Sequence, residues 1–213
     1  MQDIVIPPVG LAGLYAPPHP DCGTVVFAHG SGSGRLSPRN RAVAAALAEA
    51  GLGTLLFDLL TPDEAEDRRR VFDIPLLARR LLLATDWLQR QPGQAGLPIG
   101  YFGASTGAAA ALAAAARAAV PIAAVVSRGG RPDLAGDALA EVRTPTLLIV
   151  GGADGEVLEL NREALDALAC EKRLAVVPGA GHLFEEPGAL EAVVALARPW
   201  FAERLAVWPE ARP

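Results

Sequence analysis

The chain has 213 residues, of which 51% are hydrophobic and 20% charged, and its formal net charge is −5. This apolar content is enough for a buried core and excludes a disordered chain. The acidic balance argues against a nucleic-acid-binding protein, and we expect the run Arg68–Arg70, preceded by acidic residues, at a solvated helix end or loop. The length predicts a single domain over residues 1–213.

The N-terminus and the cysteines restrict the class further. The first ten residues lack the basic start and apolar stretch of a secretory signal, so we expect a cytoplasmic protein. The two cysteines, Cys22 and Cys170, and the three scattered histidines predict no metal site, while a single disulfide stays open. Residues 107–126 contain Arg117 and Pro121, so we expect a buried helix and strand there and no membrane span.

The first two elements in chain order form a predicted antiparallel hairpin at one edge, Asp3–Ile6 and Leu11–Tyr15. Short apolar runs then recur along the chain, as is typical of strands buried on both faces of a parallel sheet. These predicted strands are Thr24–Ala28, Thr54–Phe57, Ile99–Phe102, Ala123–Ser127, Thr146–Val150 and Leu174–Val177.

Helical segments alternate with these strands, namely Arg39–Ala50, Ile74–Arg90, Ser105–Ala119, Leu160–Ala169 and Pro187–Leu205. Pro199 predicts a kink or a break in the last helix. The alternation predicts a doubly wound α/β fold with a mostly parallel sheet flanked by helices. The connection from Ser127 to Thr144 is too short for a lid domain, so none is expected.

The stretch IGYFGASTGAAAAL places a serine between two glycines where a predicted strand meets a helix. In the pattern Gly-x-Ser-x-Gly, the serine sits on a strained turn, and Gly103 and Gly107 let strand and helix approach. This nucleophile elbow exposes the hydroxyl of Ser105 at the carboxyl end of the sheet, where sites form. The simpler alternative is that Ser105 only caps the helix.

Two later residues complete a catalytic triad in the chain order Ser, Asp, His. Asp154 follows a predicted strand, and His182 lies in the loop after the last one. A serine hydroxyl needs a histidine base, which a carboxylate orients. Asp154 could instead serve only a local turn, in which case Glu156 is the fallback acid, and His182 could be a surface turn residue.

The glycine-rich stretch FAHGSGSGR predicts the other half of an oxyanion hole. We expect the backbone N–H groups of Ser31 and Thr106 to stabilise an oxyanion, the second from a helix N-terminus. The alternative is a phosphate loop, but the glycines follow GxGxG and no P-loop lysine follows, so no cofactor is expected.

Three further residues lie near these strand ends. We expect His29 to hold the oxyanion loop by hydrogen bonding and Asp58 to fix a neighbouring loop. Arg128 either faces the substrate, selecting an acidic group through a bidentate contact, or pairs with Asp133 or Asp58.

The chain resembles the α/β-hydrolase superfamily, in its small lid-less branch similar to dienelactone hydrolases. The residues that carry the resemblance are His29-Gly30, Gly103-Ala104-Ser105-Thr106-Gly107, Asp154 and Gly181-His182. The resemblance covers about Val5 to Phe201 and implies hydrolysis of esters or lactones without metal or cofactor. Dienelactone hydrolases proper use a cysteine nucleophile where this chain has Ser105, which favours plain esters.

The sequence thus predicts a serine hydrolase acting on a small ester, through an acyl-enzyme, without a nucleic-acid or membrane partner. Without a lid, we expect a shallow, open pocket and short-chain, soluble substrates. A thioesterase, amidase or peptidase would use the same triad, and a non-catalytic binding protein could share the fold. The oligomeric state stays open between monomer and homodimer.

Overall fold

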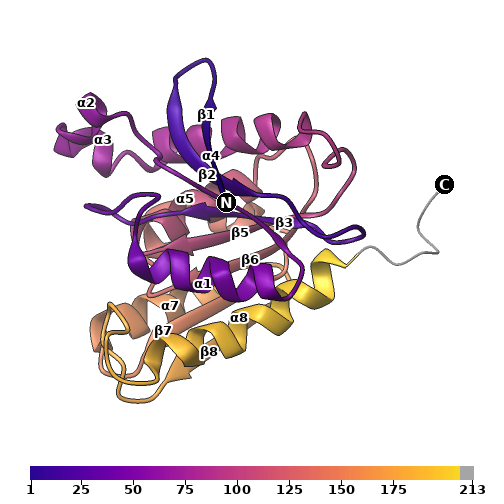
Figure 1. Cartoon of the computed structure of the whole chain (residues 1–213). Coiled ribbons are helices and arrows are strands. Elements are labelled where there is room, and N and C mark those ends of the chain that lie inside the picture. The colour runs from indigo at the N-terminus through magenta and orange to yellow at the C-terminus, as the bar shows by residue number, and fades with distance from the viewer. Residues whose placement is uncertain (207–213) are drawn as a thin grey trace.

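An eight-stranded sheet in the order β1-β2-β4-β3-β5-β6-β7-β8 forms the centre of the computed structural model, which describes residues 1–206 (Figure 1). The end of the predicted domain, residues 207–213, lies outside the described residues. The strands are β1 Gln2–Ile6, β2 Leu11–Ala16, β3 Thr24–Ala28, β4 Gly53–Phe57, β5 Ile99–Ala104, β6 Ile122–Arg128, β7 Thr146–Gly151 and β8 Lys172–Val177.

The predicted hairpin at the sheet edge is confirmed. β1 and β2 pair antiparallel, and β2 also runs antiparallel to β4, while every later pairing is parallel. The central strands β3, β4, β5 and β7 are buried along their whole length, as their continuous apolar runs predict. The carboxyl ends of the parallel strands therefore meet at one edge of the sheet, where the predicted polar residues gather.

Helices cover both faces of the sheet (Figure 1). The helices are α1 Pro38–Glu49, α2 Pro62–Ala65, α3 Arg68–Val71, α4 Ile74–Gln89, α5 Thr106–Ala115, the 3₁₀ turn η1 Pro132–Ala135, α6 Ala138–Glu141, α7 Gly155–Ala167 and α8 Ala189–Leu205. Helices α1 and α8 pack on one face, and α4, α5 and α7 on the other. The doubly wound α/β fold is thereby confirmed.

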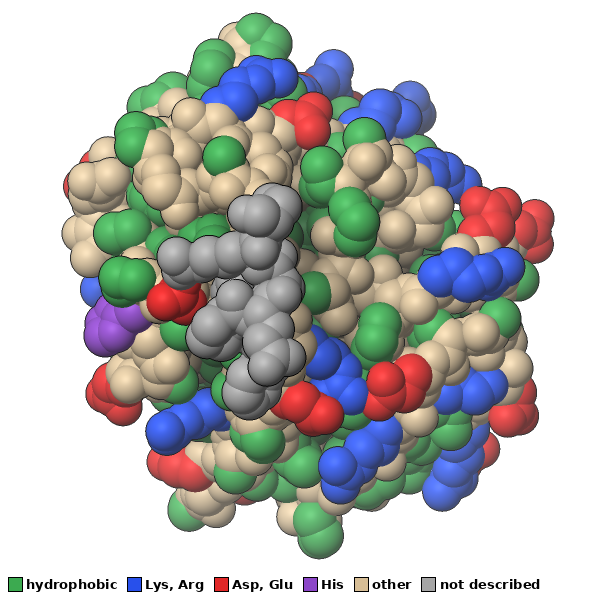
Figure 2. Space-filling model, turned by 90° about the vertical axis from the view of Figure 1, so that its right-hand side faces the viewer, with side chains coloured by type: hydrophobic (Ala, Val, Ile, Leu, Met, Phe, Trp, Pro, Cys, Tyr) green, Lys and Arg blue, Asp and Glu red, His purple; other side chains and the backbone are tan. Residues whose placement is uncertain are grey.

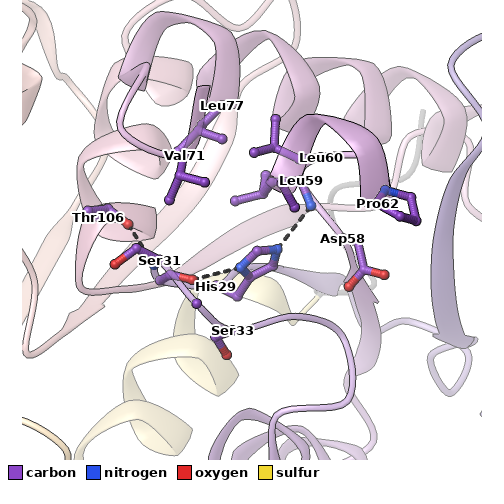
Figure 3. Close-up of a pocket in the computed structure, with 13 residues that line it drawn as sticks. His29, Ser31, Ser33, Asp58, Leu59, Leu60, Pro62, Val71, Leu77 and Thr106 are labelled. Carbon is purple, nitrogen blue, oxygen red and sulfur yellow. Dashed lines mark hydrogen bonds between the residues drawn. The ribbon is translucent and has the colours of Figure 1, made fainter. Parts of the chain in front are cut away.

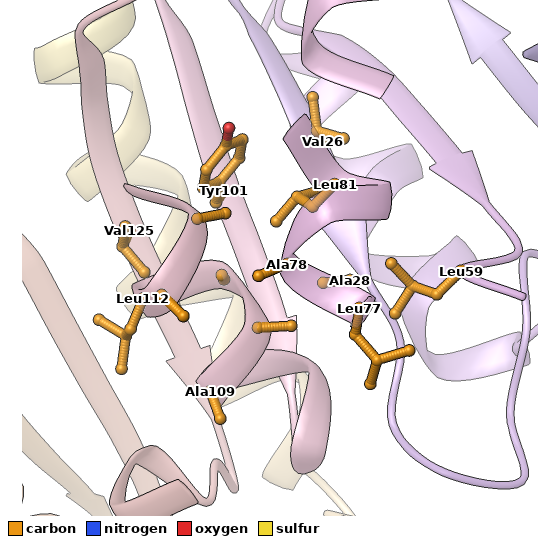
Figure 4. Close-up of a cluster of buried hydrophobic side chains, with 14 of the residues drawn as sticks. Val26, Ala28, Leu59, Leu77, Ala78, Leu81, Tyr101, Ala109, Leu112 and Val125 are labelled. Carbon is orange, nitrogen blue, oxygen red and sulfur yellow. The ribbon is translucent and has the colours of Figure 1, made fainter. Parts of the chain in front are cut away.

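The larger core lies between the sheet and the α4–α5 pair (Figure 4). Leu77 and Leu81 of α4 and Leu112 of α5 meet Tyr101 and Val125 of the sheet. Small alanines on the buried face of α5 let this helix approach the sheet closely. The core consequently fixes the first turn of α5, which directly follows Ser105.

Several element boundaries differ from the predictions. Helix α7 begins at Gly155, directly after Asp154, whereas the apolar pattern predicts a start at Leu160. Helix α8 continues through Pro199, so the predicted break does not occur. Its apolar residues, including Trp200 and Phe201, stay packed against the sheet on both sides of the proline.

The segment between β4 and α4 holds two short helices that the sequence patterns did not predict as such. Helix α2 starts with a capping box, in which the side chain of Thr61 accepts from the amide of Glu64 and Glu64 accepts from the amide of Thr61. Glu64 also forms ion pairs with Arg70 and Arg80. The run Arg68–Arg70 thus belongs to α3 and is partly neutralised by this glutamate.

Charges of both signs are interspersed on the face shown in Figure 2, with apolar side chains between them. No helix among residues 1–206 is long and apolar enough to cross a membrane. The cysteines Cys22 and Cys170 are both free.

Candidate active site

Ser105 occupies the sharp turn between β5 and α5. Its backbone has φ of 51° and ψ of −124°, a left-handed conformation that is strained for a residue with a Cβ. The amide of Ser105 donates to the carbonyl oxygen of Arg128 at the end of β6, and its carbonyl accepts from the amide of Arg131. These bonds hold the strained turn in place and present the side chain above the sheet.

Glycine is required on both sides of this turn because the backbone is crowded there. A Cβ at Gly103 would lie 2.4 Å from the Cα of Ala108, and one at Gly107 would lie 2.1 Å from the carbonyl oxygen of Ala28. Real Cβ contacts are longer than this, so either position excludes a larger residue without a backbone shift. Residues 103–107 thus form a sharp, crowded turn between β5 and α5, which is the geometry that a nucleophile elbow needs.

Two adjacent loops bring Asp154 and His182 together. The amide of Ala153 in the β7–α7 loop donates to the carbonyl of Ala180 in the loop before α8, at 2.9 Å. Gly151 permits this contact, since a Cβ there would lie 2.3 Å from the carbonyl oxygen of Ala180. The loops therefore meet across β7 and β8, which are neighbours in the sheet.

His182 lies between the other two predicted triad members. Its Nδ1 is 2.7 Å from Asp154 Oδ2, and its Nε2 is 3.3 Å from Ser105 Oγ. A carboxylate accepts from Nδ1–H, which leaves Nε2 as the acceptor for the serine hydroxyl. The Asp154 side chain is 16% exposed and that of His182 is 37% exposed. Glu156, the fallback acid, is exposed in the first turn of α7 and does not contact His182.

His29 holds the loop that carries Ser31. Its Nε2 accepts from the amide of Leu59 at 3.0 Å, so the proton lies on Nδ1, which donates to the carbonyl oxygen of Gly30 at 2.9 Å. Burial lowers the pKa of His29 below 6.5, against opposing effects of the Gly30 hydrogen bond and the Asp58 charge. A neutral imidazole with both nitrogens engaged fits a loop-holding residue, as predicted.

Asp58 fixes the next part of the same loop. Its Oδ1 accepts from the backbone amide of Arg35 at 2.7 Å, and its Oδ2 forms an ion pair with the guanidinium of Arg35. A Cβ at Gly34 would lie 2.7 Å from Asp58 Oδ1, so the carboxylate needs the glycine beside it. Both groups that the carboxylate contacts belong to Arg35, which lies in the loop after β3.

Ser31 and Thr106, the two residues predicted to donate to an oxyanion, are neighbours and share a hydrogen bond that was not predicted. The amide of Ser31 donates to the side-chain oxygen Oγ1 of Thr106 at 3.0 Å (Figure 3). Thr106 is the first residue of α5, where a backbone N–H has no partner within the helix. Both groups are therefore adjacent to Ser105, although the Ser31 N–H already has an acceptor.

A cavity of about 330 Å³ opens beside these donors (Figure 3). Its polar end is formed by residues 29–33 of the loop after β3 together with Thr106 and Asp58, and its apolar walls come from the segment after β4 and from α4. The wall residues are Leu59, Leu60, Pro62, Ala65, Val71 and Leu77. We expect a shallow, open pocket because the connection at residues 127–144 is short. The walls of the cavity come from a different segment, residues 59–77. The capping box in that segment is the sequence signal that could have revealed these walls.

Arg128 is buried at the end of β6, with 7% of its surface exposed. Neither Asp133 nor Asp58 pairs with it, because Asp133 binds Arg131 and Asp58 binds Arg35. Its Nε is buried without a hydrogen-bond partner in the part of the chain that the structure describes. Burial and the charge of Arg39 lower the pKa of Arg128 to about 10, which leaves it charged at neutral pH.

The described residues include no group of three or more histidine, cysteine, aspartate or glutamate side chains that could hold a metal ion. The site does bring together a serine hydroxyl, an imidazole, a carboxylate and the backbone amides of Ser31 and Thr106. Such a set can move a proton and stabilise an oxyanion, which are the steps of acyl transfer.

The family follows from a comparison of the sequence with protein-family models, because residues 12–202 match the model of the dienelactone hydrolase family. The chain belongs to the dienelactone hydrolase family. The predicted resemblance is thereby confirmed. Among solved structures, the dienelactone hydrolase from Anabaena variabilis is 55% identical with a TM-score of 0.90, covering 96% of this chain and 98% of that one.

More distant solved structures share the fold. Est1E from Butyrivibrio proteoclasticus has a TM-score of 0.80 at 18% identity, covering 95% of this chain and 98% of that chain, which shows the fold alone. A putative phosphoribosyl transferase of Mycobacterium tuberculosis is 60% identical over 202 residues, which are 95% of this chain and 46% of the relative. The chain thus spans less than half the length of that relative.

Proposed function

We propose that the chain is a serine esterase in which Ser105 is the nucleophile, His182 the base and Asp154 the residue that orients it. The observation that carries the proposal is His182, whose two ring nitrogens lie within hydrogen-bonding distance of Ser105 and Asp154 at once. Membership of the dienelactone hydrolase family and the 55% identical dienelactone hydrolase from Anabaena variabilis support a hydrolase.

The reaction proceeds in two halves with balanced proton transfers. Ser105 Oγ attacks the acyl carbon, its proton passes to His182 Nε2, and the carbonyl electron pair moves onto oxygen. Collapse of this intermediate breaks the ester bond, and the departing alcohol takes the proton from His182. Water then gives a proton to His182 and attacks the acyl carbon, which forms a second tetrahedral intermediate. Its collapse breaks the bond to Ser105 Oγ and releases the acid, while the proton on His182 passes to Ser105 Oγ.

The backbone amides of Thr106 and Ser31 stabilise the oxyanion of each intermediate. Thr106 N–H stands at the N-terminus of α5, where the helix dipole favours negative charge. In this proposal the Ser31 N–H, which donates to Thr106 Oγ1 in the free protein, turns to the oxyanion from the loop after β3, which His29 and Asp58 hold. Gly103 and Gly107 serve the reaction indirectly, by permitting the elbow that aims Ser105.

The cavity indicates what the apolar part of the substrate looks like. Its six apolar wall residues suit a short hydrocarbon or aromatic group, and its polar end lies at the oxyanion donors. An ester whose carbonyl is bound at Ser31 and Thr106 would therefore place an apolar group between Leu60, Val71 and Leu77.

Of the two roles left open for Arg128, we propose contact with a second, acidic group of the substrate. It lacks an ion-pair partner within residues 1–206. Its backbone carbonyl accepts a hydrogen bond from the amide of Ser105, so the two residues are neighbours. Arg39 lies nearby and adds a second positive charge, its carboxylate partner Glu185 being exposed. An unpaired buried charge is costly, which supports an anionic group of the substrate as the missing partner.

The test is hydrolysis of p-nitrophenyl esters from acetate to octanoate by the wild type and by Ser105→Ala and His182→Ala. We expect both variants to lose at least about 1,000-fold in kcat. The matched control is His19→Ala, which removes an exposed histidine. Retained activity in Ser105→Ala would reject the nucleophile, and faster cleavage of matched thioesters or anilides than of esters would reject the substrate class.

A further inference from the structure

The hydroxyl of Thr106 has a contact that a passive elbow residue does not need. It accepts a hydrogen bond from the Ser31 amide at 3.0 Å, across 75 positions of sequence. That amide is the proposed oxyanion donor of the loop after β3. The donor is thus already directed at a side-chain oxygen before any substrate is present.

The direction of the Ser31 N–H places the oxyanion beside this hydroxyl. An N–H group forms strong hydrogen bonds only along a narrow range of directions. A substrate oxygen that accepts from Ser31 must lie close to where Thr106 Oγ1 now accepts. The substrate oxygen and the hydroxyl consequently come within hydrogen-bonding distance of one another.

The hydroxyl also has a hydrogen to give. Thr106 Oγ1 forms no second hydrogen bond among residues 1–206, so its own hydrogen is uncommitted. A hydroxyl can donate one bond and accept others at the same time. The side chain is buried, with 4% of the residue exposed, and its β-branch restricts rotation about χ1.

We propose that the Thr106 hydroxyl is a third oxyanion donor. In the free protein it holds the Ser31 N–H in position by accepting from it. When the tetrahedral intermediate forms, the Ser31 N–H shifts to the oxyanion, and Thr106 Oγ1–H donates to the same oxygen. No proton is transferred and no bond to Thr106 forms.

The exchange suits the demands of catalysis. Donors held in position before the reaction stabilise developing charge with little reorganisation, and here the two groups only exchange one acceptor for another. The hydroxyl keeps the loop amide aligned, and it is released only by a substrate oxygen that offers a stronger, negatively charged acceptor. The inference rests on the proposed function, because it assigns a role within the same oxyanion hole.

The experiment compares Thr106→Val, which keeps the shape and removes the hydroxyl, with Thr106→Ser, which keeps the hydroxyl. Loss of a single oxyanion donor lowers kcat by about 100-fold in known cases. We expect Thr106→Val to lose roughly 10- to 100-fold in kcat with little change in KM, and Thr106→Ser to stay within about threefold of wild type. The KM of a p-nitrophenyl ester and the inhibition constant of a trifluoromethyl ketone, which forms an oxyanion with Ser105, are measured in parallel.

The matched control is Thr54→Val. Thr54 lies on β4, is fully buried, and its hydroxyl has no hydrogen-bond partner in the described part of the chain. The same substitution there removes a hydroxyl without removing a bond, so kcat and the ketone affinity should not change.

The inference is supported if Thr106→Val weakens the ketone by the same factor as kcat. It is overturned if Thr106→Val is as active as wild type, or more active. The hydroxyl would then only accept the hydrogen bond of the Ser31 N–H and give nothing to the oxyanion. It is also overturned if KM rises and the ketone affinity does not fall. The proposed function fails separately, if Ser105→Ala retains the activity of the wild type.

Discussion

The guanidinium of Arg128 lies over the ring of Phe184, 5.8 Å from the ring centroid. Phe184 follows His182 by two positions in the sequence. Phe184 is buried and adopts φ of 55°, an unfavourable conformation for an aromatic residue. Gly129 packs against the same loop, since a Cβ there would lie 2.9 Å from the carbonyl oxygen of His182. The end of β6 and the loop that carries His182 thus pack against each other, and the buried charge of Arg128 lies at this contact.

The first prediction concerns this charge. If Arg128 binds an acidic group of the substrate, 4-acetoxybenzoate should be preferred over the neutral 4-acetylphenyl acetate, after correction for their rates with hydroxide. A hydrogen bond to a charged group contributes about 1.5–3 kcal/mol, so Arg128→Gln should lower this preference by roughly 10- to 100-fold. Kinetics of the two esters measure the ratio directly.

The control for Arg128 is Arg41→Gln, which removes an exposed charge from the same end of α1 that carries Arg39. It should leave both rates unchanged. A wild-type enzyme that shows no preference for the carboxylate, or a preference that survives in Arg128→Gln, would contradict the role of Arg128 while leaving the triad intact.

The second prediction concerns the elbow. Gly107→Ala places a Cβ 2.1 Å from the carbonyl oxygen of Ala28 and 2.5 Å from that of His29, so β3 and α5 must move apart. Overpacking of this kind costs about 1–3 kcal/mol. Urea denaturation should show this loss of stability, accompanied by a lower kcat. Gly155→Ala, where nothing lies within 4 Å of the added Cβ, is the control and should be nearly neutral.

The third prediction concerns pH. Burial lowers the pKa of His29 in the folded state below the ordinary value of 6.5. As pH falls below 6.5, the unfolded chain binds a proton that the folded chain does not. The stability contributed by neutral His29 is therefore complete above pH 6.5 and is lost as pH falls towards the folded-state pKa.

Urea midpoints between pH 7.5 and pH 5 measure this loss. His29→Gln should reduce the dependence of stability on pH in that window, at the cost of a lower stability at pH 7.5. An equally steep pH dependence in His29→Gln would show that other groups cause it. The exposed His19, changed to Gln, should retain the wild-type dependence.

The fourth prediction concerns the cavity wall. Leu77→Trp fills part of the cavity of about 330 Å³ next to the proposed oxyanion donors. A buried methylene contributes about 0.8 kcal/mol, so the preference for a hexanoate over an acetate ester should fall by about tenfold or more. An unchanged ratio of the two rates would mean that the apolar part of the substrate lies elsewhere.

Much of this site could be predicted from local sequence. The elbow depends on a short pattern of small residues around Ser105, and the triad on the order of polar residues after strands. Helix α4 was predictable because its leucines follow a helical period over sixteen residues. In each case the signal lies within a single element or at its end.

Other features depend on contacts between distant segments. The bond from Ser31 to Thr106 spans 75 positions, and the isolation of Arg128 arises because Arg131 and Arg35 take the nearby carboxylates. No local pattern records which partner a side chain meets. The continuation of α8 through Pro199 has the same origin, since packing of Trp200 and Phe201 outweighs a local preference to end the helix.

The central claim is that Ser105 is the nucleophile activated by His182, and labelling with a fluorophosphonate tests it most directly. The probe reacts with an activated serine, and peptide mass spectrometry locates the adduct. We expect a single adduct on Ser105 in the wild type and in His19→Ala, and strongly slowed labelling in His182→Ala. An adduct on another residue, or equal labelling of His182→Ala, would contradict the proposed triad.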